Sequence, residues 1–370
     1  MPLHRRDFLL SSALALKATA APAAGEKRNH QSGMAYRRLG RTGYLISEVV
    51  MGGNTISVQN NDHVLMALDM GLNYLDTAPA YGNLKSELGY APVIKARGRD
   101  KFFLNSKVSV WDINRNKLYA DIFASLDATE QKRLQGLAKE ELERRQALAP
   151  DYYGNYFPAQ SVELEASALS NVMAAQYGHK IDRRKNYHDL ILKSVDESLA
   201  RLGTDHLDLL MCPHGACTPY ELLNHPEIFE AFEKLKKAGK ARAFGVSAHN
   251  DPGGILEAAV KAKMYSAAMV AYNIVNHGYV DRALEAAHKA DLGVIAMKVA
   301  RPVNPGRGPG SVAAPERLAK INAAIPGGLK VPMKAYVWAL KNPNLTAVIS
   351  EMITAEHVKD NVPLARAAKA

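Results

Sequence analysis

Four polar side chains follow apolar runs of this sequence and could together move a proton. They are Asp76, Tyr81, Lys107 and His214. Each apolar run predicts a buried β-strand, so all four residues lie at or just beyond the C-terminal end of a strand. In a barrel of parallel strands those ends form one face, and that face carries the chemistry. A carboxylate, a phenol, an amine and an imidazole that converge there make a site for proton transfer.

Strand and helix patterns alternate along most of the chain, which predicts a mostly parallel α/β sheet. Eight strand patterns lie at 48–53, 73–76, 102–108, 207–212, 242–246, 267–271, 293–297 and 347–350. A β-hairpin is predicted ahead of them at 36–47, with Gly40 and Gly43 marking its turn. We therefore expect a single (β/α)8 TIM barrel over residues 25–370, preceded by this N-terminal hairpin.

The connection after the third predicted strand is far longer than a barrel loop needs. It contains helical patterns at 129–148 and 161–177, joined by the aromatic segment 151–158. We expect a helical insertion over about 112–185, emerging from the catalytic face because it follows a strand's C-terminal end. Two roles stay open, a lid over the site and a surface for oligomerisation or a partner. The aromatic segment slightly favours a lid.

The first 24 residues read as an export signal. Arg5 and Arg6 precede a short apolar, alanine-rich stretch, and small residues at 18–23 offer cleavage sites. The paired arginines followed by Phe8 and Leu9 resemble a twin-arginine signal. We expect the twin-arginine export machinery as a partner, and a periplasmic or otherwise exported location. Export of this kind carries folded proteins, commonly with a cofactor already loaded.

Composition excludes several classes of protein. The chain has 370 residues, is 47% hydrophobic and carries a formal charge of +10 spread along its length. Dispersed charge favours solvated helix faces, so we expect no nucleic-acid partner. No run of about 18 apolar residues predicts a membrane helix in the mature protein. Cys212 and Cys217 flank His214; we expect free thiols, although pairing across this loop stays open in an oxidising compartment.

The order of these motifs resembles that of the aldo-keto reductase superfamily over nearly all of the mature sequence except the insertion. The shared motifs are Asp-x-Ala-x-x-Tyr-Gly at 76–82, Ser-Lys at 106–107, Leu-Leu-x-x-x-His at 209–214, the hairpin turn at 39–43 and Phe-Gly-Val-Ser at 244–247. The end of the seventh strand, Met297-Lys298, is similar to a bacterial branch. The resemblance implies hydride transfer between a nicotinamide cofactor and a small carbonyl or alcohol substrate, sugars included.

The resemblance also implies a role for each of the four polar residues. Tyr81 would be the acid in carbonyl reduction and the base in alcohol oxidation. A free phenol has a pKa of about 10, and the Lys107 ammonium is expected to lower that of Tyr81. Asp76 would hold Lys107 in place, and His214 would donate a second hydrogen bond to orient the carbonyl.

The expected cofactor is NADP or NAD. By resemblance its binding residues are Ser247, Asn273, Met297, Lys298, Ser350, Glu351, His357 and Asn361. Glu351 and His357 replace the basic residues that hold the 2′-phosphate of NADP in the family, which favours NAD. The residues expected around the nicotinamide ring also differ from those of the family, because Ala248, Met269 and Met297 replace family residues that contact the ring.

Two alternatives compete with the reductase hypothesis. His214, His249 and His277 follow successive strands and could bind a metal with Asp76, but no metal-binding spacing is present, so we expect none. The chain could also be a non-catalytic barrel that binds a ligand or partner. The altered ring contacts motivate that alternative, and the four intact polar residues oppose it.

Overall fold

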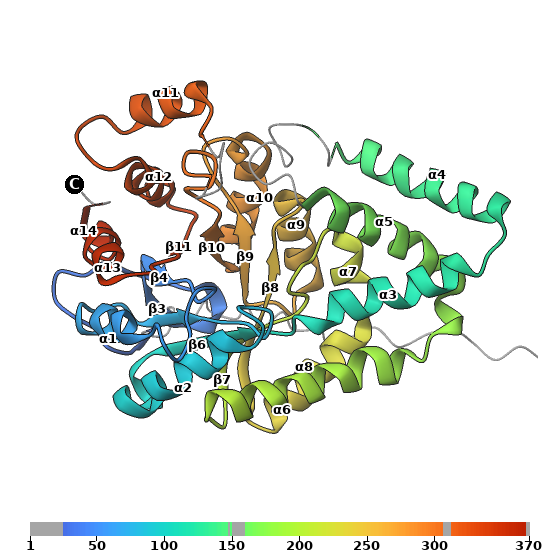
Figure 1. Cartoon of the computed structure of the whole chain (residues 1–370), viewed down its shortest axis with the longest axis horizontal. Helices are drawn as coiled ribbons and strands as arrows, with labels where there is room; N and C mark the ends of the chain where they lie inside the picture. Colours follow the sequence, from blue (N-terminus) through green and yellow to red (C-terminus); the bar gives the residue numbers. More distant parts are fainter. Residues whose placement is uncertain (1–24, 147–148, 150–159, 306–311, 368–370) are drawn as a thin grey trace, which may run out of the picture.

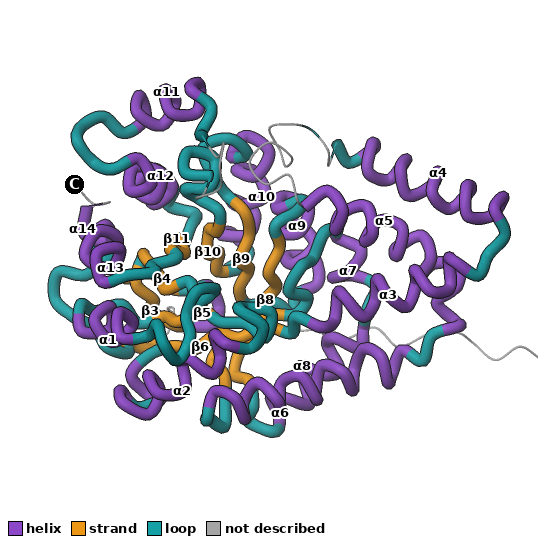
Figure 2. The backbone as a smooth tube through the Cα atoms, in the orientation of Figure 1, coloured by secondary structure: helices purple, strands orange, loops and turns teal. Residues whose placement is uncertain are grey.

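The computed structural model describes residues 25–146, 149, 160–305 and 312–367. Eight parallel strands close into a barrel in sequence order, with helices around it, so the predicted TIM barrel is confirmed (Figures 1 and 2). The strands are β4 (Val49–Met51), β5 (Tyr74–Asp76), β6 (Phe103–Lys107), β7 (Leu207–Met211), β8 (Ala241–Ala248), β9 (Ala267–Ala271), β10 (Gly293–Met297) and β11 (Ala347–Ser350). Pairing of β11 with β4 closes the barrel.

Helices cover the outside of the barrel, and several of them bury an apolar stripe. The longer ones are α1 (Asp62–Asp69), α2 (Lys85–Arg97), α6 (Leu190–Leu202), α8 (Pro226–Lys237), α9 (Pro252–Ala262), α10 (His277–Lys289), α11 (Pro315–Ala324) and α12 (Val331–Leu340). Shorter ones are α7 (Pro219–Leu223), α13 (Ala355–Asn361) and α14 (Leu364–Ala367). In α6, Ile191, Val195 and Leu199 recur every four residues and are buried. That helix ends at Gly203, which adopts the left-handed conformation that glycine tolerates best.

A small sheet closes the end of the barrel where the strands begin. It consists of β1 (Glu26–Lys27), β2 (Tyr36–Arg38) and β3 (Tyr44–Ser47), with β2 and β3 forming the predicted hairpin. Leu39, Tyr44 and Ile46 from this sheet pack with the side chains that fill the barrel interior. The hairpin therefore plugs one end of the barrel and leaves the opposite end for the site.

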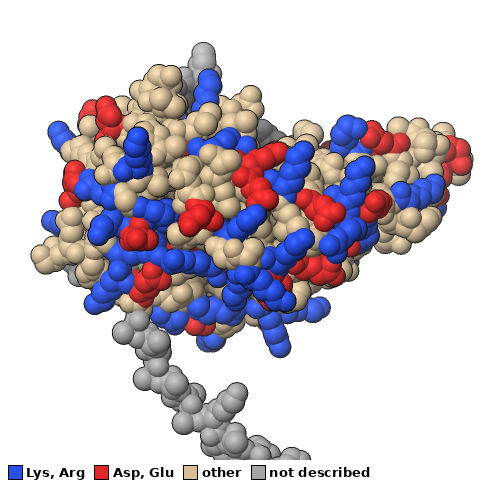
Figure 3. Space-filling model, turned by 90° about the horizontal axis from the view of Figure 1, so that it is seen from below, with Lys and Arg blue, Asp and Glu red and all other residues tan. Residues whose placement is uncertain are grey.

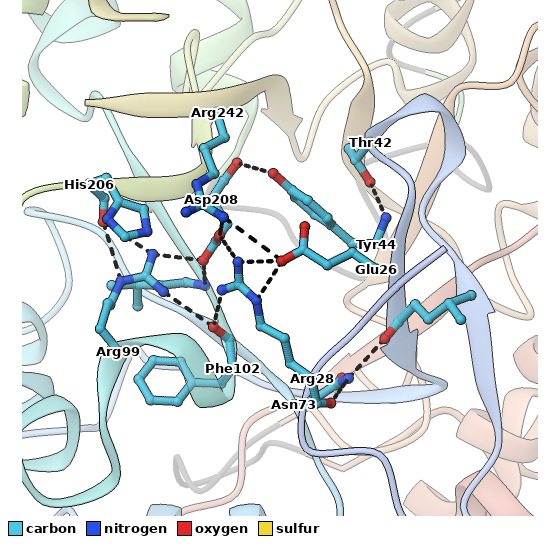
Figure 4. Close-up of polar contacts among 12 residues, drawn as sticks. Glu26, Arg28, Thr42, Tyr44, Asn73, Arg99, Phe102, His206, Asp208 and Arg242 are labelled. Atoms are coloured by element: carbon cyan, nitrogen blue, oxygen red, sulfur yellow. Dashed lines mark hydrogen bonds and ion pairs between the residues drawn. The ribbon is translucent and has the colours of Figure 1, made fainter. Parts of the chain in front are cut away.

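Asp208, at the start of β7, ties this small sheet to the barrel (Figure 4). Its carboxylate lies 2.9 Å from Arg28, 2.7 Å from Arg99 and 3.6 Å from Arg242. The Tyr44 hydroxyl donates to the Asp208 carbonyl oxygen at 3.2 Å. One fully buried carboxylate thus joins the N-terminal segment to three successive strands of the barrel.

Helices extend from the barrel between β6 and β7. They are α3 (Val110–Ala124), α4 (Ala128–Arg144), α5 (Gln160–Tyr177), the 3-10 turn η4 (Gly178–Lys180) and the π-helical turn η5 (Arg184–Asp189), and in Figure 1 α4 projects beyond the barrel. Buried Arg115 of α3 connects them, because it donates to Asn171 of α5 and, at 3.1 Å, to His225 before α8. Arg145, just after α4, forms an ion pair with Asp251 in the loop after β8. The expected aromatic segment 151–158 lies outside the described residues.

Charge on the surface is mixed. Figure 3 shows Lys and Arg across one face of the molecule with Asp and Glu among them. Within the described residues, none of the helices is long and apolar enough to cross a membrane. The expected export signal at 1–24 lies outside the residues that the structure describes.

Candidate active site

The four polar residues come together at the C-terminal end of the barrel. Asp76 and Lys107 end the neighbouring strands β5 and β6, and His214 lies in the loop after β7. The Lys107 ammonium donates to Asp76 Oδ1 at 2.5 Å and to the Thr77 carbonyl at 2.9 Å. Lys107 Nζ lies 4.5 Å from the centroid of the Tyr81 ring. The Tyr81 and His214 rings meet edge to face, with centroids 5.7 Å apart.

Burial dominates the charges of this cluster. Asp76 and Lys107 are each only 1% exposed. Burial raises the pKa of Asp76, and the Lys107 charge opposes that shift. Burial likewise lowers the pKa of Lys107, with the Asp76 charge opposing it. The two groups therefore stabilise one another's charged forms where water cannot.

The expected effect of Lys107 on Tyr81 is wrong. The pKa of Tyr81 is raised well above its usual value, first by burial and then by the negative charge of Asp76. Both effects disfavour the phenolate form. Lys107 directs its ammonium to Asp76, whose negative charge adds to the effect of burial on the Tyr81 pKa. Tyr81 is therefore held as a protonated phenol.

His214 is held from two sides by residues that the sequence motifs do not single out. Its Nδ1 lies 2.8 Å from Ser109 Oγ, and Ser109 Oγ also accepts from the Ala80 N–H at 3.3 Å. Asp112 Oδ2 accepts from the backbone N–H groups of His214 at 3.0 Å and of Gly215 at 3.1 Å. Burial lowers the pKa of His214 well below its usual value, so the imidazole is neutral. The position of Ser109, two residues beyond Lys107, is the one sequence signal for this contact.

A cavity of about 550 Å³ opens beside Tyr81. Its lining comprises Gly52, Gly53, Asn54, Thr55, Asp76, Tyr81, His249, Met269, Met297, Lys298, Val299, Ala300, Arg301, Asn304, Tyr336, Ile349, Glu351, Ile353 and His357. Four of the eight expected cofactor residues line this cavity, namely Met297, Lys298, Glu351 and His357. Cationic side chains on its wall suit a dinucleotide's diphosphate, so the cavity fits a nicotinamide cofactor in size and charge.

The other four expected cofactor residues do not line the cavity. Ser247, Asn273 and Ser350 are at most 2% exposed. Asn361 Nδ2 donates to Ser350 Oγ at 3.0 Å, so these two residues hold each other. Asn273 Oδ1 accepts from the backbone of Val275 and Asn276, while its buried Nδ2 has no hydrogen-bond partner among the described residues.

The histidines proposed as metal ligands face different ways. His249 lines the cavity, and His214 packs against Tyr81. His277 instead pairs with Asp281 of its own helix at 3.0 Å and packs on Trp338. Across the described residues, no three His, Cys, Asp or Glu side chains are grouped so that they could bind a metal. Cys212 and Cys217 are buried free thiols.

Comparison with known proteins gives the class of this site. The Aldo/keto reductase family matches residues 50–145 and 175–367. Oxidoreductase YdhF of Escherichia coli is 44% identical over 70 residues, 19% of this chain and 21% of that protein. The uncharacterized oxidoreductase YqkF of Bacillus subtilis is 25% identical over 217 residues, 58% of this chain and 49% of that protein. The chain thus matches half or less of the length of these curated relatives.

Solved structures share the fold over much more of their length. A Bacillus halodurans aldo-keto reductase in its holo form has a TM-score of 0.57 and 20% identity, and the match covers 90% of each chain. One from Klebsiella pneumoniae, in complex with NADPH, has a TM-score of 0.56 and 19% identity over 90% of this chain and 89% of that one. The chain belongs to the aldo/keto reductase family.

Proposed function

We propose that this protein reduces a small carbonyl compound to an alcohol, with Tyr81 as the proton donor. The observation that carries the proposal is the cluster of four polar residues, in which Asp76 and Tyr81 line the cavity and Lys107 and His214 pack against Tyr81. A bound nicotinamide would supply the hydride to such a carbonyl. The residues of this chain would then orient the carbonyl and give its oxygen a proton.

The protonation states of Tyr81 and His214 suit a proton donor and a hydrogen-bond donor. A phenol donates its proton to the oxygen that becomes an alkoxide, and burial keeps Tyr81 in its protonated form. The neutral His214 imidazole has one N–H with which to hold the carbonyl oxygen. The hydrogen bond from Lys107 to Asp76 holds the ammonium group in contact with the Tyr81 ring.

The cavity wall offers residues that would hold the cofactor. Lys298 and Arg301 would hold its diphosphate, because both line the cavity and carry positive charge. Glu351 lies in the same wall, where a carboxylate would repel a 2′-phosphate. This supports NAD as the preferred cofactor of this chain, although relatives from Klebsiella pneumoniae are described with NADPH and NADP.

The export signal expected at 1–24 supports a location of this reaction outside the cytoplasm. The paired arginines motivate transport by the twin-arginine machinery, which carries folded proteins. Cofactor would then be loaded before export and retained in the periplasm. A compound such as a sugar, available in that compartment, is the substrate class to test first.

The first experiment identifies what the exported protein carries. Protein purified after export is heat-denatured, and the released small molecules are identified by mass spectrometry. The emptied protein is then titrated with NADH and NADPH by fluorescence. Stoichiometric NAD supports both the redox chemistry and retention through export, and tighter binding of NADH supports the role of Glu351. Failure to bind either nucleotide would contradict the proposal and favour a ligand-binding barrel.

Replacing Tyr81 with Phe tests the proton donor. We expect Tyr81→Phe to lower kcat by about 10²-fold or more, because general acid catalysis contributes about 10²–10⁴-fold. Its Kd for NADH should remain that of the unmodified protein. Tyr177→Phe is the matched control, since its hydroxyl binds Glu130 at 2.8 Å within the helical extension. Near-full turnover in Tyr81→Phe would contradict the assignment.

A further inference from the structure

The first residues after β6 hold His214 from two directions. We propose that Ser109 and Asp112 are positioning residues: Ser109 keeps the imidazole proton on Nε2, and Asp112 fixes the backbone that carries the ring. The inference rests on the proposed function, because it gives His214 the task of orienting a carbonyl. It extends that function to two residues outside the four-residue cluster.

The hydrogen bonds of Ser109 favour a proton on one of the two imidazole nitrogens. Ser109 Oγ accepts from the Ala80 N–H at 3.3 Å. That contact does not use the hydroxyl's own hydrogen, and we assign this hydrogen to His214 Nδ1, which lies 2.8 Å away. A neutral imidazole that accepts at Nδ1 must carry its proton on Nε2. Because Ala80 precedes Tyr81, the same hydroxyl also joins the tyrosine loop to the histidine ring.

Asp112 acts on the backbone. Its Oδ2 accepts from two successive N–H groups, those of His214 and Gly215, at 3.0 and 3.1 Å. Its buried Oδ1 has no hydrogen-bond partner in the described part of the chain. Asp112 lies in the first turn of α3, so the start of the helical extension fixes the position of the loop that carries His214.

The tautomer matters for the proposed chemistry. A carbonyl oxygen carries lone pairs and must meet a hydrogen-bond donor. An imidazole protonated on Nε2 can present that N–H while Nδ1 faces Ser109. The other tautomer would donate to Ser109 and place a lone pair at Nε2. Loss of the Ser109 hydroxyl should therefore impair orientation of the carbonyl without affecting the cofactor.

Ser109→Ala tests this in turnover. We expect kcat to fall about tenfold, which corresponds to the loss of about 1.4 kcal/mol of transition-state stabilisation, while the Kd for NADH stays unchanged. The control is Ser125→Ala, which removes an exposed hydroxyl from the other end of α3. In a His214→Ala background, Ser109→Ala should have no further effect, because its action passes through His214. An equal effect in both backgrounds would overturn the proposal.

The tautomer can also be measured without turnover. The ¹⁵N chemical shifts of the His214 ring distinguish a protonated from an unprotonated nitrogen, and His214→Ala assigns the signals. We expect a protonated Nε2 in the unmodified protein and a mixture of tautomers in Ser109→Ala. A protonated Nδ1 in the unmodified protein would overturn the proposal. If no carbonyl compound were reduced, the proposed function would fail, while this spectrum would still decide the tautomer.

Asp112 is tested with paired substitutions. Asp112→Ala removes the acceptor for both backbone N–H groups and should lower kcat about tenfold, with the Kd for NADH unchanged. Asp112→Asn keeps an oxygen in that place and should retain most of the rate. Asp121→Ala, on the same helix with a 63% exposed carboxylate, is the control. Equal kcat values for Asp112→Ala and Asp121→Ala would overturn the role of Asp112.

Discussion

At the scale of single residues, burial determines which side chains of the site carry a proton. Types and spacing in the sequence were enough to predict that Asp76, Tyr81, Lys107 and His214 meet at one end of a barrel. They were not enough to predict the pKa shift of Tyr81, because the direction of that shift depends on burial and on the position of Asp76, which pairs with Lys107. Charge can be read from a residue type, whereas desolvation requires the packed structure.

Asp112 gives a stability prediction with a definite sign. Burial raises its pKa to about 7, the Glu221 charge adds to that shift, and the N–H groups of Gly215 and His214 and the charge of Arg115 oppose it. The folded state thus binds the Asp112 proton more tightly than the unfolded chain, whose carboxyl has a pKa of about 3.9. This contribution to the free energy of unfolding is present below about pH 4 and is lost as the pH rises to about 7.

Replacing Asp112 with Asn should remove that dependence. At pH 8 the variant is expected to unfold at a higher temperature than the unmodified protein, with a gain of at most about 4 kcal/mol. The gain should shrink as the pH falls toward 4, where the natural carboxyl is protonated in the folded state and about half protonated in the unfolded chain. Thermal unfolding followed by circular dichroism at both pH values measures this. The same difference at pH 8 and pH 4 would contradict the prediction.

At the scale of elements, the extension between β6 and β7 depends on one buried cation. Arg115 is 1% exposed, donates to Asn171 and His225, and lies 3.9 Å from Glu221. It therefore links α3 to α5 and to the segment before α8. Removing one partner of a buried charged network leaves the others without compensation.

Arg115→Ala should lower the free energy of unfolding by about 3–5 kcal/mol. Because Arg115 links α3 to α5, we also expect faster proteolysis in α4 and α5 than in the barrel helices. Urea unfolding and limited proteolysis measure the two effects. Arg133→Ala, in the same extension but with a 48% exposed side chain, provides the control. An unchanged unfolding midpoint in Arg115→Ala would show that apolar packing alone holds the extension.

The elements themselves were predictable to different degrees. Strand patterns were clear because β-branched and apolar runs are short and bounded by polar residues, and β9 and β10 fall where expected. Helix α3 was missed, since Asp112, Asn114 and Asn116 are weak helix formers in its first two turns. Its buried Trp111 and Tyr119 pack into the core, so tertiary contacts stabilise what local propensity does not.

At the scale of the whole molecule, the buried ion pairs of Asp208 and the candidate active site lie at opposite ends of the barrel. Asp208 joins three arginines where the strands begin, and the proposed chemistry lies where they end. The sequence predicted the hairpin and the barrel separately. It did not show that Asp208 connects them, because its partners come from distant parts of the chain.

Asp208→Ala should therefore separate stability from activity. We expect the free energy of unfolding to fall by about 3–5 kcal/mol, because Arg99 loses its carboxylate partner and the buried Arg28 keeps only Glu26. The kcat of the protein that remains folded should match that of the unmodified chain. Asp291→Ala, which breaks a half-exposed pair with Arg38 at the same end, should have little effect on stability. A loss of kcat in Asp208→Ala without loss of stability would contradict this division.

The neighbouring strands β6 and β7 pair in parallel, with Asn105 opposite Leu209, although all of the helical extension lies between them in sequence. Closing so long a loop costs entropy before the strands can pair, and distant contacts slow folding. Packing of α3 against α5 and α6 shortens the effective path between the two strand ends. The packed helices of the extension therefore hold the ends of β6 and β7 close together, next to the wall that carries Lys107 and His214.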